Sequence, residues 1–330
     1  MSKQGSEPWQ QAAPPTSVPL AEPPFVDHDG ASNLSPVPGT AVDSDEPPAL
    51  LFHDGPGYDP GPDHHRGSKR RPNWGIGEVL MVIPIMGIVL ALSFAIMVVL
   101  AALEGTDLED LTSGGMDNLP PSMLIVPTLV QQLAWFGWPF VVSKLKGLGP
   151  ARDWGWAFKP VDLAIGIGTA FIAMFAAALI GAGVGFAVGL EDNTAAQNTQ
   201  VLTGMKDSPW LYGLLFIVVI GAPFSEEVLF RGLVMRAFQK RWGVVAGVAA
   251  SILSFVPLHL ADGGVFSAGQ LVLWATIGTL GGILAAAALM TRRLAAPIVA
   301  HILINAFGAA AALGAFDSFI ELSLAPCGGC

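Results

Sequence analysis

The sequence predicts an all-α fold, a polytopic bundle of about seven transmembrane helices. Of its 330 residues, 52% are hydrophobic and only 13% are charged, and the mean hydropathy is +0.56. Ordinary soluble domains carry about 25% charged residues. From residue 80 onward, long uncharged runs alternate with short charged segments. Because lipid offers no hydrogen bonds to an open backbone, such runs are expected to be helices.

Seven runs are candidates for crossing a bilayer, which takes about 20 apolar residues. Five runs reach that length by themselves: 80–103, 123–143, 163–190, 263–291 and 294–316. The run 210–225 reaches it by continuing towards Gln239, and the run 242–258 approaches it by including His259. A break near Pro223 would make eight spans.

The charges between these runs alternate in sign. Basic residues precede the first run and follow the second, fourth and sixth, whereas acidic residues dominate after the first and third. The positive-inside rule therefore places the N-terminus in the cytoplasm and, with seven spans, the C-terminus outside. Glycine and alanine are frequent in the spans, especially at 181–185, 278–282 and 285–288, which favours close contact between helices.

The first part of the chain has a different composition. Residues 1–73 hold fourteen of the 26 prolines, and ten acidic against five basic residues. Such a segment cannot bury enough apolar surface to fold. We therefore divide the chain into a disordered cytoplasmic tail (1–75), N-terminal transmembrane helices (76–204), motif-bearing transmembrane helices (205–315) and a C-terminal tail (316–330).

The tails carry no convincing site. His64 and His65 lie in the polar N-terminal segment, and Cys327 and Cys330 end the chain. We interpret all four as solvated tail residues rather than as a metal or redox site, because chain ends are usually poorly ordered. The net charge of −10 gives no sign of nucleic-acid binding.

The most informative feature is a group of charges inside the fourth span. Glu226, Glu227 and Arg231 lie in an otherwise apolar stretch, and charges at membrane depth usually face a protein interior or a wet cavity and mark function. Glu227 and Arg231 are four residues apart with the acid first, the better order for a helical ion pair. Glu226 is rotated by about 100° from Glu227 and is free to act on another group.

Three further polar side chains occupy later apolar segments. His259 follows Pro257 at the end of the fifth run, and His301 and Asn305 share a face of the seventh. Counted from the nearest basic residues, Glu226 and His259 are about 21 and 27 Å deep, whereas His301 is only about 12 Å deep. A helix tilt, or a break at Pro223 or Pro257, is therefore needed to bring these residues together.

These residues resemble the motifs of a known family. Glu-Glu-x-x-x-Arg at 226–231, Phe-x-x-x-His at 255–259 and His-x-x-x-Asn at 301–305 look like the three ordered motifs of the CPBP family, the CAAX proteases and bacteriocin-processing proteases also called Abi or type II CAAX proteases. The resemblance covers roughly residues 205–310. It implies an intramembrane endopeptidase of the bacterial plasma membrane, acting on a peptide or a membrane-protein substrate.

The resemblance also implies roles for the site residues. Glu226 and His259 would activate the attacking water, and His301 and Asn305 would stabilise the oxyanion, with Glu227 and Arg231 supporting the site. Alternatively Glu226, His259 and His301 would bind Zn²⁺, leaving a position for water. A zinc site leaves Asn305 without a role, which favours the metal-independent route.

Two other classes of function are compatible with the buried charges. An ion- or proton-coupled transporter also places acids and histidines inside a membrane, but no repeated half with matching broken helices is evident in the sequence. A non-catalytic membrane scaffold is the third class. Substitution of Glu226 discriminates between the classes, because a scaffold would tolerate it and an enzyme would not.

Overall fold

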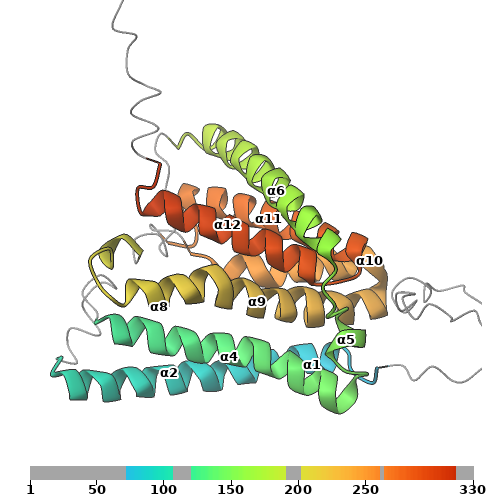
Figure 1. The fold of residues 1–330 in the computed structure, drawn as a ribbon, viewed down its shortest axis with the longest axis horizontal. Helices are drawn as coiled ribbons and strands as arrows, with labels where there is room; N and C mark the ends of the chain where they lie inside the picture. The colour runs from blue at the N-terminus through green and yellow to red at the C-terminus, as the bar shows by residue number, and fades with distance from the viewer. Residues whose placement is uncertain (1–71, 107–119, 191–201, 261–263, 317–330) are drawn as a thin grey trace, which may run out of the picture. The chain divides into compact units, whose positions relative to one another are not determined.

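The computed structural model describes residues 72–106, 120–190, 202–260 and 264–316. Most of the two predicted tails lies outside these residues, together with His64, His65, Cys327 and Cys330. Every regular element in the described ranges is helical (Figure 1). The α-helices are α1 (Ile76–Leu80), α2 (Val82–Glu104), α4 (Pro121–Lys146), α5 (Pro150–Asp153), α6 (Pro160–Ala187), α8 (Leu211–Phe216), α9 (Ala222–Glu226), α10 (Met235–Phe255), α11 (Ala268–Thr291) and α12 (Ala295–Ala312).

Two π-helical segments and a short 3₁₀ turn complete the description. The π-helical segments are η3 (Ile217–Gly221) and η4 (Glu227–Val234), and they join α8, α9 and the first part of α10, as far as Gly243, into one continuous rod. The alternative of a break near Pro223, which would have given eight spans, does not agree with this helical backbone. Proline lacks an N–H group, but at the first turn of α9 it is tolerated because the helix widens into a π turn just before it. The 3₁₀ turn η5 (Val256–Leu258) contains Pro257 and ends the fifth predicted span.

The described helices confirm the predicted polytopic bundle. Six helical stretches are long and apolar enough to cross a membrane, and one of them, Leu211–Leu258, has 48 residues. A straight helix of that length would measure about 72 Å, more than twice the about 30 Å of a bilayer core. This stretch is divided at Gly243, whose backbone (φ 87°, ψ 177°) is not helical. The arm after Gly243 ends at Leu258 and is shorter than the about 20 residues of a usual span, so the described residues show six candidate spans where the sequence predicts seven.

Gly243 is the turn of a helical hairpin. The arm that follows it returns along the arm that precedes it, because Phe255 lies 5.2 Å from Phe230 between ring centroids. Nearer the turn the two backbones almost touch: a Cβ atom on Gly247 would lie 2.6 Å from the Met235 carbonyl oxygen. The hairpin brings the second motif back beside the first.

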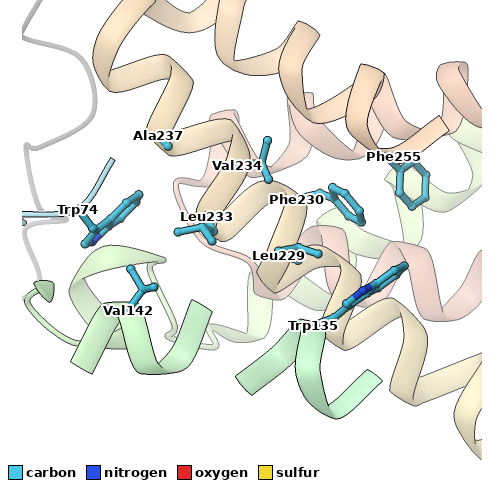
Figure 2. Close-up of a cluster of buried hydrophobic side chains, with 9 residues drawn as sticks. All are labelled: Trp74, Trp135, Val142, Leu229, Phe230, Leu233, Val234, Ala237 and Phe255. Carbon is cyan, nitrogen blue, oxygen red and sulfur yellow. The ribbon is translucent and has the colours of Figure 1, made fainter. Parts of the chain in front are cut away.

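The largest buried apolar cluster fills the space between this hairpin and α4 (Figure 2). Trp135 of α4 meets Phe230 edge to face, with ring centroids 5.8 Å apart. Trp74 closes the other end of the cluster and is only 5% exposed. Residues 72–75, which we assigned to the tail, are therefore packed on the bundle, and the Asn73 amide donates to the Lys146 carbonyl.

Many large apolar side chains lie on the outer surface of the described helices. Large side chains such as Leu90, Phe175 and Phe186 are 72%, 74% and 91% exposed. Apolar patches of this extent are rare on soluble monomers and mark contact with a membrane or partner. Together with the six apolar helical stretches, they identify an integral membrane protein.

Small residues allow α6 to pack closely against α11 and α12. A Cβ atom on Gly166 would lie 2.6 Å from Val299 Cγ1 and 2.9 Å from the Ala296 carbonyl oxygen, and one on Gly181 would lie 2.8 Å from Thr276 Oγ1. Without a hydrophobic drive between helices in lipid, such close packing is what holds them together. The glycine-rich stretch at 181–185 is thus a helix contact, as predicted, although Gly183 itself faces open space.

Substitution of Gly166 by alanine is expected to destabilise the bundle. The added methyl group would overlap Val299 and force α6 away from α12, at a cost of about 1–3 kcal/mol. The matched control is Gly183→Ala on the same helix, where nothing lies within 4 Å of the new Cβ atom. Denaturation of the purified protein in detergent measures both. Equal stability of the two variants would contradict the close contact.

Candidate active site

The ion pair predicted from the fourth span is present and fully buried. Arg231 Nη1 donates to Glu227 Oε1 at 2.9 Å, and both side chains are 0% exposed. The second terminal nitrogen of Arg231 donates to the Gly281 carbonyl at 3.0 Å, and the guanidinium lies 4.9 Å from the ring centroid of Phe255. A side chain at position 281 would crowd the guanidinium, because a Cβ atom there would lie 3.3 Å from Arg231 Nη2.

His301 lies between the two glutamates. Its Nδ1 atom is 3.0 Å from Glu227 Oε1, and its Nε2 atom is 3.7 Å from Glu226 Oε2. Glu227 is an acceptor, so Nδ1 must donate to it, and Nε2 is left to face Glu226. One carboxylate thus orients the ring while the other meets its reactive nitrogen, the logic by which a buried acid orients the histidine of a hydrolase triad. Glu226 and His301 retain 12% and 8% side-chain exposure.

Asn305 is held by a backbone irregularity of the fourth span. Its Nδ2 group donates to the Val218 carbonyl of η3 at 2.8 Å. The Ala222 amide donates five residues back to Ile217, and the residue after Ala222 is Pro223, which has no N–H group. The Val218 carbonyl therefore lacks a donor at the next π position, and Asn305 supplies it. Since an amide nitrogen carries two hydrogens, one remains for another acceptor.

Hydrogen bonds to its main-chain carbonyl hold His259 in position. It follows η5 in an extended conformation, and its carbonyl accepts hydrogen bonds from Gln270 Nε2 at 2.9 Å and Trp274 Nε1 at 3.0 Å. Its ring lies 4.8 Å from that of Phe255, which in turn lies 6.2 Å from that of His301. Phe255 thus lies against both histidines. The histidine that approaches Glu226 in the structure is His301.

The hairpin explains how residues of unequal predicted depth meet. Measured from Gly243, Glu226 and His259 are 17 and 16 residues away, or about 26 and 24 Å along their helices. They are therefore at nearly the same level. Helix α12 starts deeper, because Leu294 packs against Trp154 and Val228 rather than beside Gly243. His301 therefore meets both glutamates although it is closer in sequence to Arg293 than Glu226 is to Lys240, because Arg293 and Lys240 do not end their helices at one level.

The described parts of the chain contain no group of three His, Cys, Asp or Glu side chains placed to hold a metal ion. Glu226 and His301 approach each other, but His259 does not complete a ligand set with them. The donors that the zinc alternative requires are thus not assembled in this arrangement, and we derive no step through a metal.

Several polar residues around the site were not singled out from the sequence. Ser225 donates to Gln132 of α4 beside the glutamate pair. Arg236 donates to the Asp153 and Trp154 carbonyls, and Arg293 forms a two-pronged ion pair with Asp162. Gln132, in the middle of an apolar run, was the signal most open to sequence reasoning, because a polar side chain at that depth needs a partner.

A comparison with protein families identifies this region. Residues 208–307 match the family described as Rce1-like, type II CAAX prenyl endopeptidase. This segment is similar to the type II CAAX proteases. The resemblance drawn from three short motifs is thereby confirmed, and the matched region contains all six candidate site residues. No curated protein and no solved structure matches the chain.

The chain is accordingly a CAAX-protease-like membrane enzyme. The matched segment runs from just before α8 to the middle of α12. It therefore includes the hairpin, both glutamates and the helix that carries His301. Helices α2, α4 and α6 precede it, and α4 and α6 pack around it. The family assignment favours the protease over the transporter and scaffold alternatives.

Replacing Glu227 by glutamine is expected to destabilise the protein as well as to inactivate it. Arg231 would keep its charge in a site with 0% exposure and lose its counter-ion, which costs about 3–5 kcal/mol for a buried pair. The matched control is Glu78→Gln, whose partner Lys146 is 54% exposed, and there the loss should be about 0–1 kcal/mol. Unfolding in detergent measures both, and similar losses would show that the Glu227 pair is solvated.

Substitution of Asn305 by alanine separates its two contributions. The Val218 carbonyl would lose its donor, and unfolding should become easier by about 1–3 kcal/mol. If the second amide hydrogen serves an oxyanion, the cleavage rate should also fall by about 10²–10³. Leu303→Ala, at an exposed position of α12, is the control. A stability loss at an unchanged rate would remove Asn305 from the catalytic set.

Proposed function

We propose that the chain hydrolyses a peptide bond of a membrane-associated or peptide substrate, with Glu226 as the base that activates water. The observation that carries this proposal is the position of the His301 ring, whose two nitrogens meet Glu227 and Glu226. A carboxylate that is partly exposed, next to an oriented histidine, is the arrangement that general base catalysis needs.

The remaining residues take roles that follow from their contacts. Glu227 and Arg231 are fully buried and hold His301 in place, so they are positioning residues. When the His301 ring carries a proton on each nitrogen, Nε2 is a donor, and it is then available to an oxyanion together with the second Asn305 amide hydrogen. Donors aimed at developing charge are the largest single source of rate in many hydrolases. His259 is proposed to assist Glu226 with the attacking water, as in the family motif.

The substrate class follows from the setting of the site. Glu226 lies in a helix that crosses the apolar bundle, so a substrate must be anchored at or within the membrane to reach it. The family is named for prenylated CAAX substrates, and we include a prenylated peptide among the substrates to be tested. The catalytic route that we propose is the metal-independent one.

The decisive test is Glu226→Gln. Purified protein in lipid vesicles is mixed with internally quenched fluorescent peptides whose central residues are varied, with and without a farnesylated cysteine. The wild type should cleave some of them and Glu226→Gln none, because the variant keeps the shape of the side chain and removes the base. Its thermal stability should be nearly unchanged. Cleavage at the wild-type rate would reject the assignment of Glu226.

Chelation tests the metal-independent route in the same assay. Treatment with a strong chelator should leave the rate unchanged if Glu226 and the histidines act without a metal. Loss of activity that Zn²⁺ restores would contradict that route and support a metal site.

A further inference from the structure

Helix α11 carries none of the three motifs, but it contacts two of them. The Gly281 carbonyl accepts a hydrogen bond from Arg231 of the first motif. Earlier on the same helix, Trp274 Nε1 and Gln270 Nε2 donate to the main-chain carbonyl of His259 in the second motif, at 3.0 and 2.9 Å. Positions spaced by four and by seven share a helix face, so both motifs are aligned against one surface of α11.

The His259 carbonyl depends on these two donors because its own helix has ended. The 3₁₀ turn η5 stops at Leu258, and His259 is extended, with φ −106° and ψ 118°. A carbonyl that leaves a helix inside an apolar bundle has no helical partner, and it is costly to leave unpaired. Gln270 is 0% exposed, so its amide group also needs an acceptor. The carbonyl and its two donors therefore satisfy one another.

The start of α11 is itself held in place. Ser267 is the N-cap residue of this helix, and its side-chain oxygen accepts a hydrogen bond from the Gln270 amide at 3.1 Å. Two turns further on, α11 packs against the second motif: a Cβ atom on Gly278 would lie 3.6 Å from Val256 Cγ2, which is ordinary contact. Packing and hydrogen bonds therefore fix the end of the second motif to α11.

The contacts of the His259 ring define which nitrogen carries a hydrogen. Nδ1 lies 3.3 Å from the Phe255 carbonyl oxygen. A carbonyl is an acceptor, so Nδ1 is the donor, and in the neutral ring Nε2 is left as the acceptor. A distance of 3.3 Å is longer than the usual about 2.9–3.0 Å of such a bond. The orientation of the ring therefore depends on the backbone that Gln270 and Trp274 hold.

We propose that Gln270 and Trp274 are positioning residues for the reaction, which hold the His259 backbone so that its Nε2 accepts a hydrogen bond from the attacking water. The proposal rests on the proposed function, in which His259 assists Glu226. Both residues act through the His259 carbonyl and not on the substrate. Since each donor still holds the carbonyl when the other is removed, loss of both should cost more than the two single losses combined.

Kinetics in the vesicle assay test the proposal. Gln270→Leu and Trp274→Phe each remove one donor and keep an apolar side chain of similar size. Each should lower kcat with KM nearly unchanged, and the double variant should lose about 10²-fold, the loss that a misplacement of about 1 Å can cause. The matched control is Thr279→Val on the same helix, whose hydroxyl donates to the Ala275 carbonyl of α11 itself, and it should keep the wild-type kcat.

Three kinetic results would overturn the proposal. The first is a wild-type kcat in both single variants. The second is a raised KM at unchanged kcat, which would place the two side chains in substrate binding. The third is a double variant whose loss is no larger than the product of the single losses. The single variants keep one donor each, so they decide the question even if the double variant does not fold.

A second measurement does not depend on turnover. Solid-state NMR of isotope-labelled histidine in the same vesicles reports which ring nitrogen carries the hydrogen, and His259→Gln assigns the His259 signals. The neutral ring should carry it on Nδ1 in the wild type, and the Gln270→Leu/Trp274→Phe variant should show both tautomers with the His301 signals unchanged. A single His259 tautomer in that variant would overturn the proposal. Mixed tautomers there, with no cleavage by the wild type, would uphold the hold on the ring and reject only the proposed function.

Discussion

The buried carboxylate of Glu227 is the group on which the site depends. It accepts from Arg231 and from His301 Nδ1 through the same oxygen, and so links the fourth and seventh spans. Arg231 carries the link on to α11 through the Gly281 carbonyl. A charge buried in this way is costly unless its partners are present, so this set of contacts ties the three helices together at one point. The same set of contacts places Glu226 against the open nitrogen of His301.

Irregular backbone is concentrated around the same residues. Both π-helical segments lie in the fourth span, one directly before Pro223 and one starting at Glu227. Such segments are rare and often occur at functional sites. The first leaves a carbonyl that Asn305 satisfies, and thereby ties α12 to η3. A second polar contact between these spans is therefore a consequence of the proline, which makes Asn305 structural whatever its part in catalysis.

The surroundings of the site are divided by chemistry. On one side the polar cluster connects α9, η4 and α12, and on the adjoining side the same three elements line an apolar cavity. Phe224 and Val228 face the cavity, whereas Glu227, between them on the same rod, faces Arg231 and His301. Helical periodicity thus supplies both environments from a single span.

The sequence alone determined the helical membrane fold and the resemblance of its three motifs to the CAAX proteases. Lipid accepts a long uncharged run only when its backbone is hydrogen-bonded within a helix, and it accepts a charge inside such a run only when that charge is paired or faces a cavity. The ion pair of Glu227 and Arg231 was also predictable, since it is local to one helix.

The tertiary structure decided what depends on long-range packing: the hairpin at Gly243, which levels His259 with Glu226, and the deeper start of α12, which brings His301 to both glutamates. It also decided that Asn305 serves a carbonyl freed near Pro223, and that Trp74 is part of the core. Spacing along the chain carries no information on the levels at which separate helices begin, so the sequence placed these residues on helices but could not place the helices against one another.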